Sequence, residues 1–297
     1  MSTPVLPGNA ANDAARDGTD TAPISRRVAE RRLLDIEVRS WPQILAPSLL
    51  GIVLLALWEG TVWLRGIPHY ILPSPLTIVT TLWRDWGSLA PSLLVTLEIT
   101  YAALASAVAT AIVLAMLFTQ WGWLEKAFLP YAVVLQVTPI VAIAPLIIIW
   151  VNDTNLSLLI CAWLVAFFPI LSNSILGLRS VDHNLLDLFE IYHASHLQTI
   201  VWLKIPAALP SFLAGLRISA GLSLIGAVVA EFVAGTGGTA SGLAYRILEA
   251  SYQINIPRMF ASLLLIALFG IANYLLVSWL TQLLLGRWHE SAVNRER

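Results

Sequence analysis

The residues that could carry chemistry are few in this chain, and their spacing excludes most catalytic and metal sites. The histidines have no metal-ligand spacing, and no H-E-x-x-H, G-x-S-x-G or C-x-x-C motif occurs. The single cysteine, Cys161, cannot form an intramolecular disulfide or a cysteine-based zinc cluster. A P-loop needs Gly directly before its Lys, whereas Lys126 and Lys204 follow Glu125 and Leu203. The sequence therefore predicts no hydrolytic or redox chemistry, no metal, no cofactor and no P-loop ATP site.

Four ionisable residues lie inside long apolar stretches: Glu59, Glu98, Arg217 and Glu231. A charged group at the centre of a bilayer costs about 2.5–3.5 kcal/mol, so each is a candidate for function. Glu59 lies near enough to the end of its stretch to reach the interface. Glu98 and Glu231 could each border a solute pathway or bond a neighbouring helix. Arg217 could pair with a carboxylate or line the pathway, but a pair with Glu231 would have to bridge about 21 Å along one helix.

The composition identifies the environment of these residues. Of the 297 residues, 58% are hydrophobic and 12% are charged, whereas soluble domains carry about 25% charged residues. A water-soluble fold of this length still exposes about 25–30% of its unfolded surface and could not hide so much apolar area. The net charge of −1 provides no basic surface for nucleic acid. We therefore expect a protein embedded in the lipid bilayer, with no nucleic-acid partner.

Six apolar stretches are long enough to cross the hydrocarbon core, which takes about 20 helical residues. They are residues 44–64, 93–118, 127–150, 156–176, 208–233 and 260–285. Pro139 and Pro145 interrupt the third stretch, and we expect it inside the bundle, where neighbours can satisfy the freed carbonyls. The predicted fold is an all-α polytopic membrane protein with six transmembrane helices.

The predicted domain organisation follows from polarity and charge. Residues 1–22 are polar and small and are expected to form a disordered cytoplasmic tail. Residues 23–43 are basic and should carry a surface helix that ends at Trp41-Pro42. Residues 44–287 form the transmembrane domain, and residues 288–297 form a second cytoplasmic tail. With this orientation the inner segments carry eleven Lys and Arg residues and the outer loops four, which favours both termini in the cytoplasm.

The inner loop, residues 177–206, is the most polar stretch outside the N-terminal tail and predicts two short helices. Asp182 or Asn184 can cap the first helix, which should run to about Tyr192. Such a helix pair can offer a surface to the groove of a soluble partner. It could instead lie on lipid headgroups, but this needs many basic residues on one face. Residues 182–204 contain one Lys against three acidic residues, which favours a partner.

The second loop helix has a recognisable start and stop. Ser195 and Gln198 have the spacing of a capping box, in which each side chain bonds the other's backbone N–H. The helix should then run from His196 to Lys204 and stop before Pro206. Pro210 suits the first turn of the fifth span.

Small residues recur along two spans and predict close helix contacts. The fifth span shows Gly215, Ser219, Ser223, Ala227 and Ala230, and the second shows Ala102, Ser106 and Thr110. Such faces let helices approach closely. A solute pathway at a dimer interface would need the same kind of face. The pattern therefore fits both plain helix packing and a place beside the pathway. The candidate pathway residues are Glu98, Arg217, Ser219, Ser223 and Glu231.

A longer pattern around the inner loop resembles a known family. Residues 185–235, LLDLFEIYHASHLQTIVWLKIPAALPSFLAGLRISAGLSLIGAVVAEFVAG, resemble the coupling loop of membrane permease subunits of bacterial ABC importers. That signature is Glu-Ala-Ala, three residues, Gly, nine residues, Ile, one residue, Leu-Pro. Residues 71–83, 138–150 and 241–265 are similar to the nitrate/sulfonate/taurine branch. The resemblance covers nearly everything after residue 40.

This chain departs from the signature at several positions. Setting Ile205-Pro206 on Leu-Pro puts Asp187-Leu188-Phe189 on Glu-Ala-Ala and His193 on the Gly. Histidine is enriched among non-glycine residues at positive φ, so the turn can form. Leu188 and Phe189 are bulkier than Ala and should present a more apolar knob to the partner. The resemblance implies coupling contacts at Asp187, Leu188, Phe189, Glu190, His193, Ala194, Ser195 and Pro206.

The resemblance also implies a function and a set of partners. It implies a type I ABC importer permease-like fold in the bacterial plasma (inner) membrane, in which two copies of the chain form a pathway. Two ATP-binding subunits would dock on the coupling loop and hydrolyse ATP, so the chain itself would not be an enzyme. An extracytoplasmic solute-binding protein would deliver cargo to residues 65–92 and 235–258. The cargo implied is a nitrate-, sulfonate- or taurine-like anion, or a pyrimidine or other vitamin precursor.

Two other classes compete with this interpretation. A proton-coupled secondary transporter acting alone would use Glu98 and Glu231 as proton relays. Many such transporters contain inverted repeats, and no internal repeat is evident here. An intramembrane enzyme would need a Ser/Lys pair or two membrane aspartates, and no Asp or Lys lies within any span core.

Overall fold

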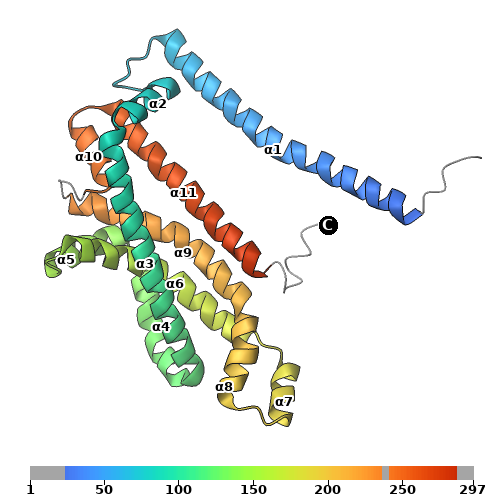
Figure 1. Cartoon of the computed structure of the whole chain (residues 1–297). Helices are drawn as coiled ribbons and strands as arrows, with labels where there is room; N and C mark the ends of the chain where they lie inside the picture. Colours follow the sequence, from blue (N-terminus) through green and yellow to red (C-terminus); the bar gives the residue numbers. More distant parts are fainter. Residues whose placement is uncertain (1–23, 236–240, 286–297) are drawn as a thin grey trace, which may run out of the picture. The chain divides into compact units, whose positions relative to one another are not determined.

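The computed structural model of the chain describes residues 24–235 and 241–285 (Figure 1). Within these ranges every regular element is a helix, which confirms the predicted all-α class. The tails expected at 1–22 and 288–297 lie outside the described residues. The elements are α1 Ile24–Arg65, α2 Pro75–Arg84, α3 Trp86–Gln120, α4 Gly122–Val137, α5 Ile140–Trp150, α6 Thr154–Arg179, α7 His183–Ile191, α8 His196–Thr199, a π-helical turn Ile200–Lys204, α9 Ile205–Ala234, α10 Leu243–Tyr252 and α11 Ile256–Leu285.

Residues 1–60 and 61–297 form separate compact units. The first contains most of α1, which runs without a break from Ile24 to Arg65. The expected helix end at Trp41-Pro42 is therefore wrong. A continuous helix satisfies the backbone groups of the apolar segment internally, which outweighs the single hydrogen bond that proline removes.

Five helical stretches in the described part are long and apolar enough to cross a membrane, and a sixth is obtained if α4 and α5 count as one bent span. Five of the six predicted spans correspond to these stretches, which match the expected ends closely or extend beyond them. The five stretches are Leu45–Arg65, Trp86–Gln120, Thr154–Arg179, His196–Ala234 and Ile256–Leu285.

The third predicted span is not one helix. α4 and α5 are bent by 103° at a break that contains Thr138 and Pro139. Thr138 has an extended backbone, with ψ 124°, as expected for a residue whose helical conformation clashes with the following proline ring. The two helices are only partly buried in the single chain, since Val137 on α4 is 71% exposed and Val141 on α5 is 58% exposed; the expected position inside the bundle stays a prediction.

The core of residues 61–297 is built around α6 and α9, which run antiparallel with α3 packed beside them (Figure 1). Glycines let the two central helices touch backbone to backbone. A Cβ at Gly226 would lie 2.8 Å from Cα of Ala162, and one at Gly177 would lie 2.8 Å from the carbonyl oxygen of Ala208. Of the small residues predicted on the fifth span, Gly215 makes the same kind of contact, because a Cβ there would lie 2.8 Å from the carbonyl oxygen of Pro169 on α6.

The two ends of this unit carry different short helices. α7 and α8 lie at one end, and α2 and α10 lie at the other (Figure 1). The short helix expected at residues 243–252 is confirmed as α10. The loop surfaces predicted to face opposite sides of the membrane are therefore at opposite ends of the helix bundle.

Candidate coupling surface and pathway residues

Both loop helices begin at side-chain caps, as their sequence predicts. Oδ1 of Asp182 accepts the N–H of Asn184 at 2.9 Å, which makes Asp182 the cap of α7. Oγ of Ser195 accepts the N–H of Gln198 at 3.3 Å, and Oε1 of Gln198 accepts the N–H of Ser195 at 2.7 Å. The predicted capping box is therefore present at the start of α8. Both helix starts are specified by residues within one turn.

The turn between the loop helices is a Schellman motif with histidine in the left-handed position. The N–H of Ala194 donates to the carbonyl of Phe189, and that of His193 donates to Glu190, both at 2.9 Å. His193 has φ 53°, so the tight turn that the signature makes with Gly forms here with His.

The second loop helix does not stop before Pro206. The π-helical turn Ile200–Lys204 joins α8 directly to α9, with the N–H of Ile205 donating to the carbonyl of Ile200. In a regular α-helix the ring of Pro206 would clash with the preceding turn and leave a carbonyl unpaired; the wider π turn relieves this. Pro210 consequently lies inside α9 rather than in the first turn of a new helix. Residues 196–234 therefore form one continuous helical segment that runs from the loop into the helix bundle.

Two polar contacts fix the loop to the ends of neighbouring helices. Arg179 at the end of α6 forms an ion pair with Glu125 of α4. His196 on α8 bonds Oε1 of Gln120, the last residue of α3, through Nε2 at 2.6 Å. Leu203 in the π turn is buried. The base of the loop is therefore tied to α3 and α4.

The outer face of the loop is exposed and apolar. Of the two residues expected to form the apolar knob, Leu188 is 44% exposed and Phe189 is half-buried. Leu188 therefore offers the more accessible side chain to a partner. Of the other residues implied by the resemblance, Ala194 is half-buried, and the exposed ones are Asp187, Glu190, His193, Ser195 and Pro206. Large exposed apolar side chains beside them are Leu185, Ile191, Tyr192, Leu197 and Trp202. We call α7 and α8 with these side chains the coupling surface; clustered exposed apolar groups mark sites for partners.

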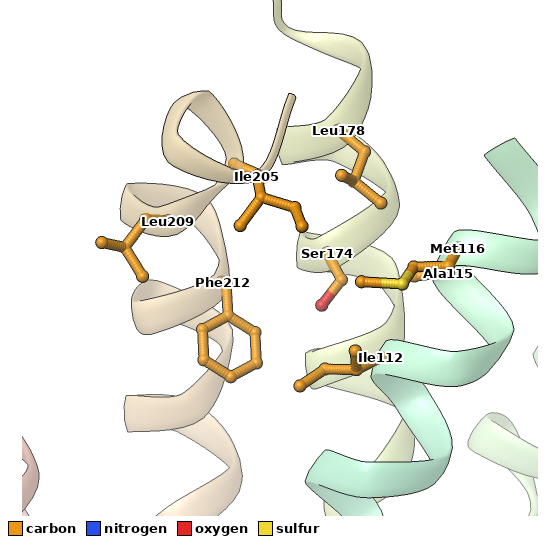
Figure 2. Close-up of a pocket in the computed structure, with 9 residues that line it drawn as sticks. Ile112, Ala115, Met116, Ser174, Leu178, Ile205, Leu209 and Phe212 are labelled. Atoms are coloured by element: carbon orange, nitrogen blue, oxygen red, sulfur yellow. The ribbon is translucent and has the colours of Figure 1, made fainter. Parts of the chain in front are cut away.

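A cavity of about 190 Å³ lies beside the first turns of α9. Figure 2 shows Ile205, Leu209 and Phe212 of α9 on one side, facing Ser174 of α6 and Ile112 of α3 across the space. Oγ of Ser174 is buried there without a hydrogen-bond partner. The lining is otherwise apolar. The first turns of α9, which line the cavity, therefore make few polar contacts with α3 and α6 there.

Two of the candidate pathway residues serve helix packing. Ser219 is buried and donates to the carbonyl of Ala166 on α6 at 2.6 Å. Ser223 is buried as well and donates to the carbonyl of Ala220 in its own helix at 3.0 Å. Both hydroxyls are therefore buried and bonded to backbone carbonyls, and that of Ser219 joins α9 to α6.

Glu231 holds α10 against the bundle. It is 3% exposed, and its carboxyl group accepts the Thr96 hydroxyl of α3 at 2.8 Å and the Ala244 N–H at 3.0 Å. Thr96 in turn accepts the N–H of Leu243 at 2.9 Å. A Cβ at Gly242 would collide with the carboxyl group of Glu231. Of the two interpretations left open by the sequence, this geometry supports the bond to neighbouring helices.

Glu98 and Arg217 are placed differently from Glu231 and from each other. Glu98 is exposed on α3 and lines a cavity of about 150 Å³ with Asn155 and Leu159 of α6. The guanidinium of Arg217 lies 6.0 Å from the ring centroid of Tyr274 on α11. Nε of Arg217 is buried without a hydrogen bond, and no carboxylate among the described residues forms an ion pair with it. The five candidates thus do not converge on one site.

A charged network at the α2/α10 end was not expected from the sequence. Arg246 donates through Nε to Ser92 at 2.8 Å and pairs with Glu249 at 2.9 Å. Arg258 lies 3.4 Å from Glu249 and 3.9 Å from Asp85. The three-residue spacing of Arg246 and Glu249 was the one local signal; the contacts of Arg246 with Ser92 and of Arg258 with Asp85 join residues more than 150 apart in the chain.

Comparison with known proteins places this architecture in a family. Residues 107–289 match the family of binding-protein-dependent transport system inner membrane components. The chain belongs to this family. It is thus a permease subunit of an ABC importer and a multi-pass membrane protein, not an enzyme; ATP hydrolysis takes place in separate ATPase subunits.

Individual relatives support the assignment along most of the chain. A probable ABC transporter permease protein of Haemophilus influenzae is 32% identical over 80% of this chain and 96% of the relative. The riboflavin transport system permease protein RibX of Chloroflexus aurantiacus is 33% identical over 91% and 99%. The formylaminopyrimidine transport permease protein ThiX of Halalkalibacterium halodurans is 33% identical over 82% and 96%. Other relatives are named as sulfonate, taurine and nitrate permeases.

The fold also matches a solved transporter. A chain in a crystal structure of an amino acid ABC transporter with histidines has a TM-score of 0.57 and 16% identity, covering 70% of this chain and 97% of that chain. At this identity the match supports the fold alone.

Proposed function

We propose that two copies of this chain line the pathway of an ATP-driven importer in the bacterial plasma membrane. Two ATP-binding subunits dock on the coupling surface in the cytoplasm, and an external binding protein delivers cargo at the α2/α10 end. Both chain termini then lie in the cytoplasm. The excess of Lys and Arg on the inner segments supports this orientation, as does the position of α7 and α8 at the end opposite to α2 and α10 (Figure 1).

The observation that carries the proposal is the continuous helix from the coupling surface into the core. Because α8, the π turn and α9 are joined without a loop, a displacement of α7 and α8 by the ATPase is passed directly to α9. The cavity beside Phe212 gives the first turns of α9 room to shift against α3 and α6. Rigid-body movement of this kind can switch a pathway between two arrangements.

The cargo is a small solute. The relatives include riboflavin and formylaminopyrimidine permeases as well as sulfonate, taurine and nitrate permeases. The candidate cargoes are a sulfonate-, taurine- or nitrate-like anion and a pyrimidine or other vitamin precursor.

The test is docking of the ATPase. Leu188→Asp places a charge on the exposed knob of α7 and should abolish copurification of the ATPase and substrate-stimulated ATP hydrolysis. Ile71→Asp is the matched control, because Ile71 is 63% exposed at the opposite end and its change should leave copurification intact. Normal copurification of the Leu188→Asp variant would contradict the proposal.

The alternative of a proton-coupled transporter makes the opposite prediction. Liposomes that contain this chain alone, with an imposed pH gradient and no ATP, would then accumulate cargo. We expect no uptake under these conditions, since the coupling surface has no partner.

A further inference from the structure

A cavity at the bend between α4 and α5 is larger than the two described above, and none of the candidate pathway residues is among those that line it. Its volume is about 330 Å³, within the range of small-molecule sites. α6 and α9 complete its walls. The lining residues are Leu135, Gln136, Val137, Thr138, Pro139, Ile140, Leu164, Val165, Phe168, Pro169 and Leu222.

The bend cannot face lipid. Non-helical backbone at membrane depth is tolerated only where it is buried in protein or lines a water-filled cavity. Here the break at Thr138-Pro139 is part of an apolar stretch, and Gln136, Val137 and Pro139 are exposed in the single chain. Under the proposed function, which this inference presupposes, the second copy and the pathway supply the protein and the water.

The cavity wall offers hydrogen-bonding groups without partners in the helices. Pro169 has no N–H for the carbonyl of Val165, four residues earlier, and both line the cavity. Pro139 likewise has none for the carbonyl of Leu135. The amide of Gln136 adds donors and an acceptor. The hydroxyl of Thr138 already donates to the carbonyl of Val134 at 2.7 Å, so its oxygen remains an acceptor.

The same wall provides no charge for an ion. None of the described residues that line the cavity is charged. The C-terminal end of α4 and the N-terminal end of α5 meet at the break, so their partial charges of opposite sign offset each other. A buried anion without a cation or a full set of donors is strongly disfavoured. Phe168 and Leu222 supply apolar surface that suits a flat ring.

We propose that this cavity is a substrate-binding site in the pathway and that it accepts a neutral heteroaromatic compound with N–H or amino donors. A free sulfonate, nitrate or taurine finds no counter-charge there. The cavity thus selects the heterocyclic class from the two cargo classes that the relatives leave open.

The experiment measures the cavity without the binding protein, which would impose its own specificity. The permease–ATPase complex in lipid nanodiscs is titrated by calorimetry with four probes: riboflavin, formylaminopyrimidine, taurine and nitrate. We expect saturable binding of at least one heterocycle and none of the two anions. Binding of taurine or nitrate, or of neither heterocycle, would overturn the proposal.

Substitutions then locate the site. Gln136→Leu should weaken binding of the heterocycle about tenfold, as expected when a ligand group loses one hydrogen-bond partner, and Thr138→Val should weaken it by a smaller factor. Gln282→Leu, at an exposed position on α11, and Thr119→Val on α3 are the controls. The Thr119 hydroxyl also bonds a carbonyl four residues earlier, at 2.8 Å. Unchanged affinity in Gln136→Leu would refute the assignment. A complex that does not form at all would refute the proposed function instead.

Discussion

Replacing Glu231 by Ala separates its two possible roles. In the structure its carboxyl group accepts the Thr96 hydroxyl at 2.8 Å and the Ala244 N–H at 3.0 Å. If these contacts are its function, Glu231→Ala should release α10 from α3 and α9. If it instead borders the pathway, the substitution should change transport and leave α10 in place.

The expected destabilisation can be worked from these contacts. The Thr96 hydroxyl keeps a partner, since it also bonds the carbonyl of Ser92 at 3.2 Å, but the Ala244 N–H is left buried and unpaired. An orphaned buried donor costs about 1–3 kcal/mol, and the one lost methylene group adds about 0.8 kcal/mol. The sum is about 2–4 kcal/mol, large enough to open α10 locally.

The assay is hydrogen–deuterium exchange over residues 243–252, together with the melting temperature of the purified protein. Exchange in α10 should accelerate about a hundredfold in Glu231→Ala, as the central value of about 3 kcal/mol implies. Glu98→Ala is the control, because Glu98 is exposed on α3 and should leave α10 protected. Equally slow α10 exchange in Glu231→Ala and in the parent protein would refute the network; reduced transport with unchanged exchange would assign Glu231 to the pathway.

Three further substitutions test packing, polar burial and backbone strain. Gly226→Ala should lower the melting temperature, with an overpacking cost of about 1–3 kcal/mol, because its Cβ would lie 2.8 Å from Cα of Ala162. Gly221→Ala, whose Cβ meets nothing within 4 Å, should raise it slightly; equal effects would contradict the close α6–α9 contact. Ser174→Ala should raise the melting temperature, because it removes a buried hydroxyl without a partner, and a drop would show that this hydroxyl is satisfied. Ile254→Gly should also raise it in a thermal scan, because this β-branched residue has φ 55° and glycine relieves about 1–2 kcal/mol of strain; an unchanged value would indicate that the turn is not strained.

Local features were predictable from the sequence because their partners are neighbours in the chain. The capping box of Ser195 and Gln198 and the start of α7 at Asp182 each depend on residues within one turn. The left-handed turn at His193, where φ is 53°, was implied by the resemblance, which sets His193 on the glycine of the signature. The coupling surface was therefore located before any tertiary contact was known.

Prolines show where local rules are insufficient. Pro139 ends a helix, Pro169 lies inside one, and Pro206 follows a π turn that keeps the helix continuous. Each has the same covalent constraint, so the outcome depends on what the surrounding helices provide for the freed carbonyl. This is why the third span was predicted as one helix and the second loop helix was predicted to stop too early.

The sequence by itself determined the membrane environment, the number of apolar stretches and the starts of the two coupling-loop helices, because composition and short-range spacing decide these properties. Only the tertiary structure decided which ionisable residues of the apolar stretches hold helices together and which are exposed. Glu98 and Glu231 have the same signal in the sequence, yet the first is exposed and the second is buried under α10. The difference arises from contacts between segments more than a hundred residues apart, such as Thr96 with Glu231, which no local pattern encodes.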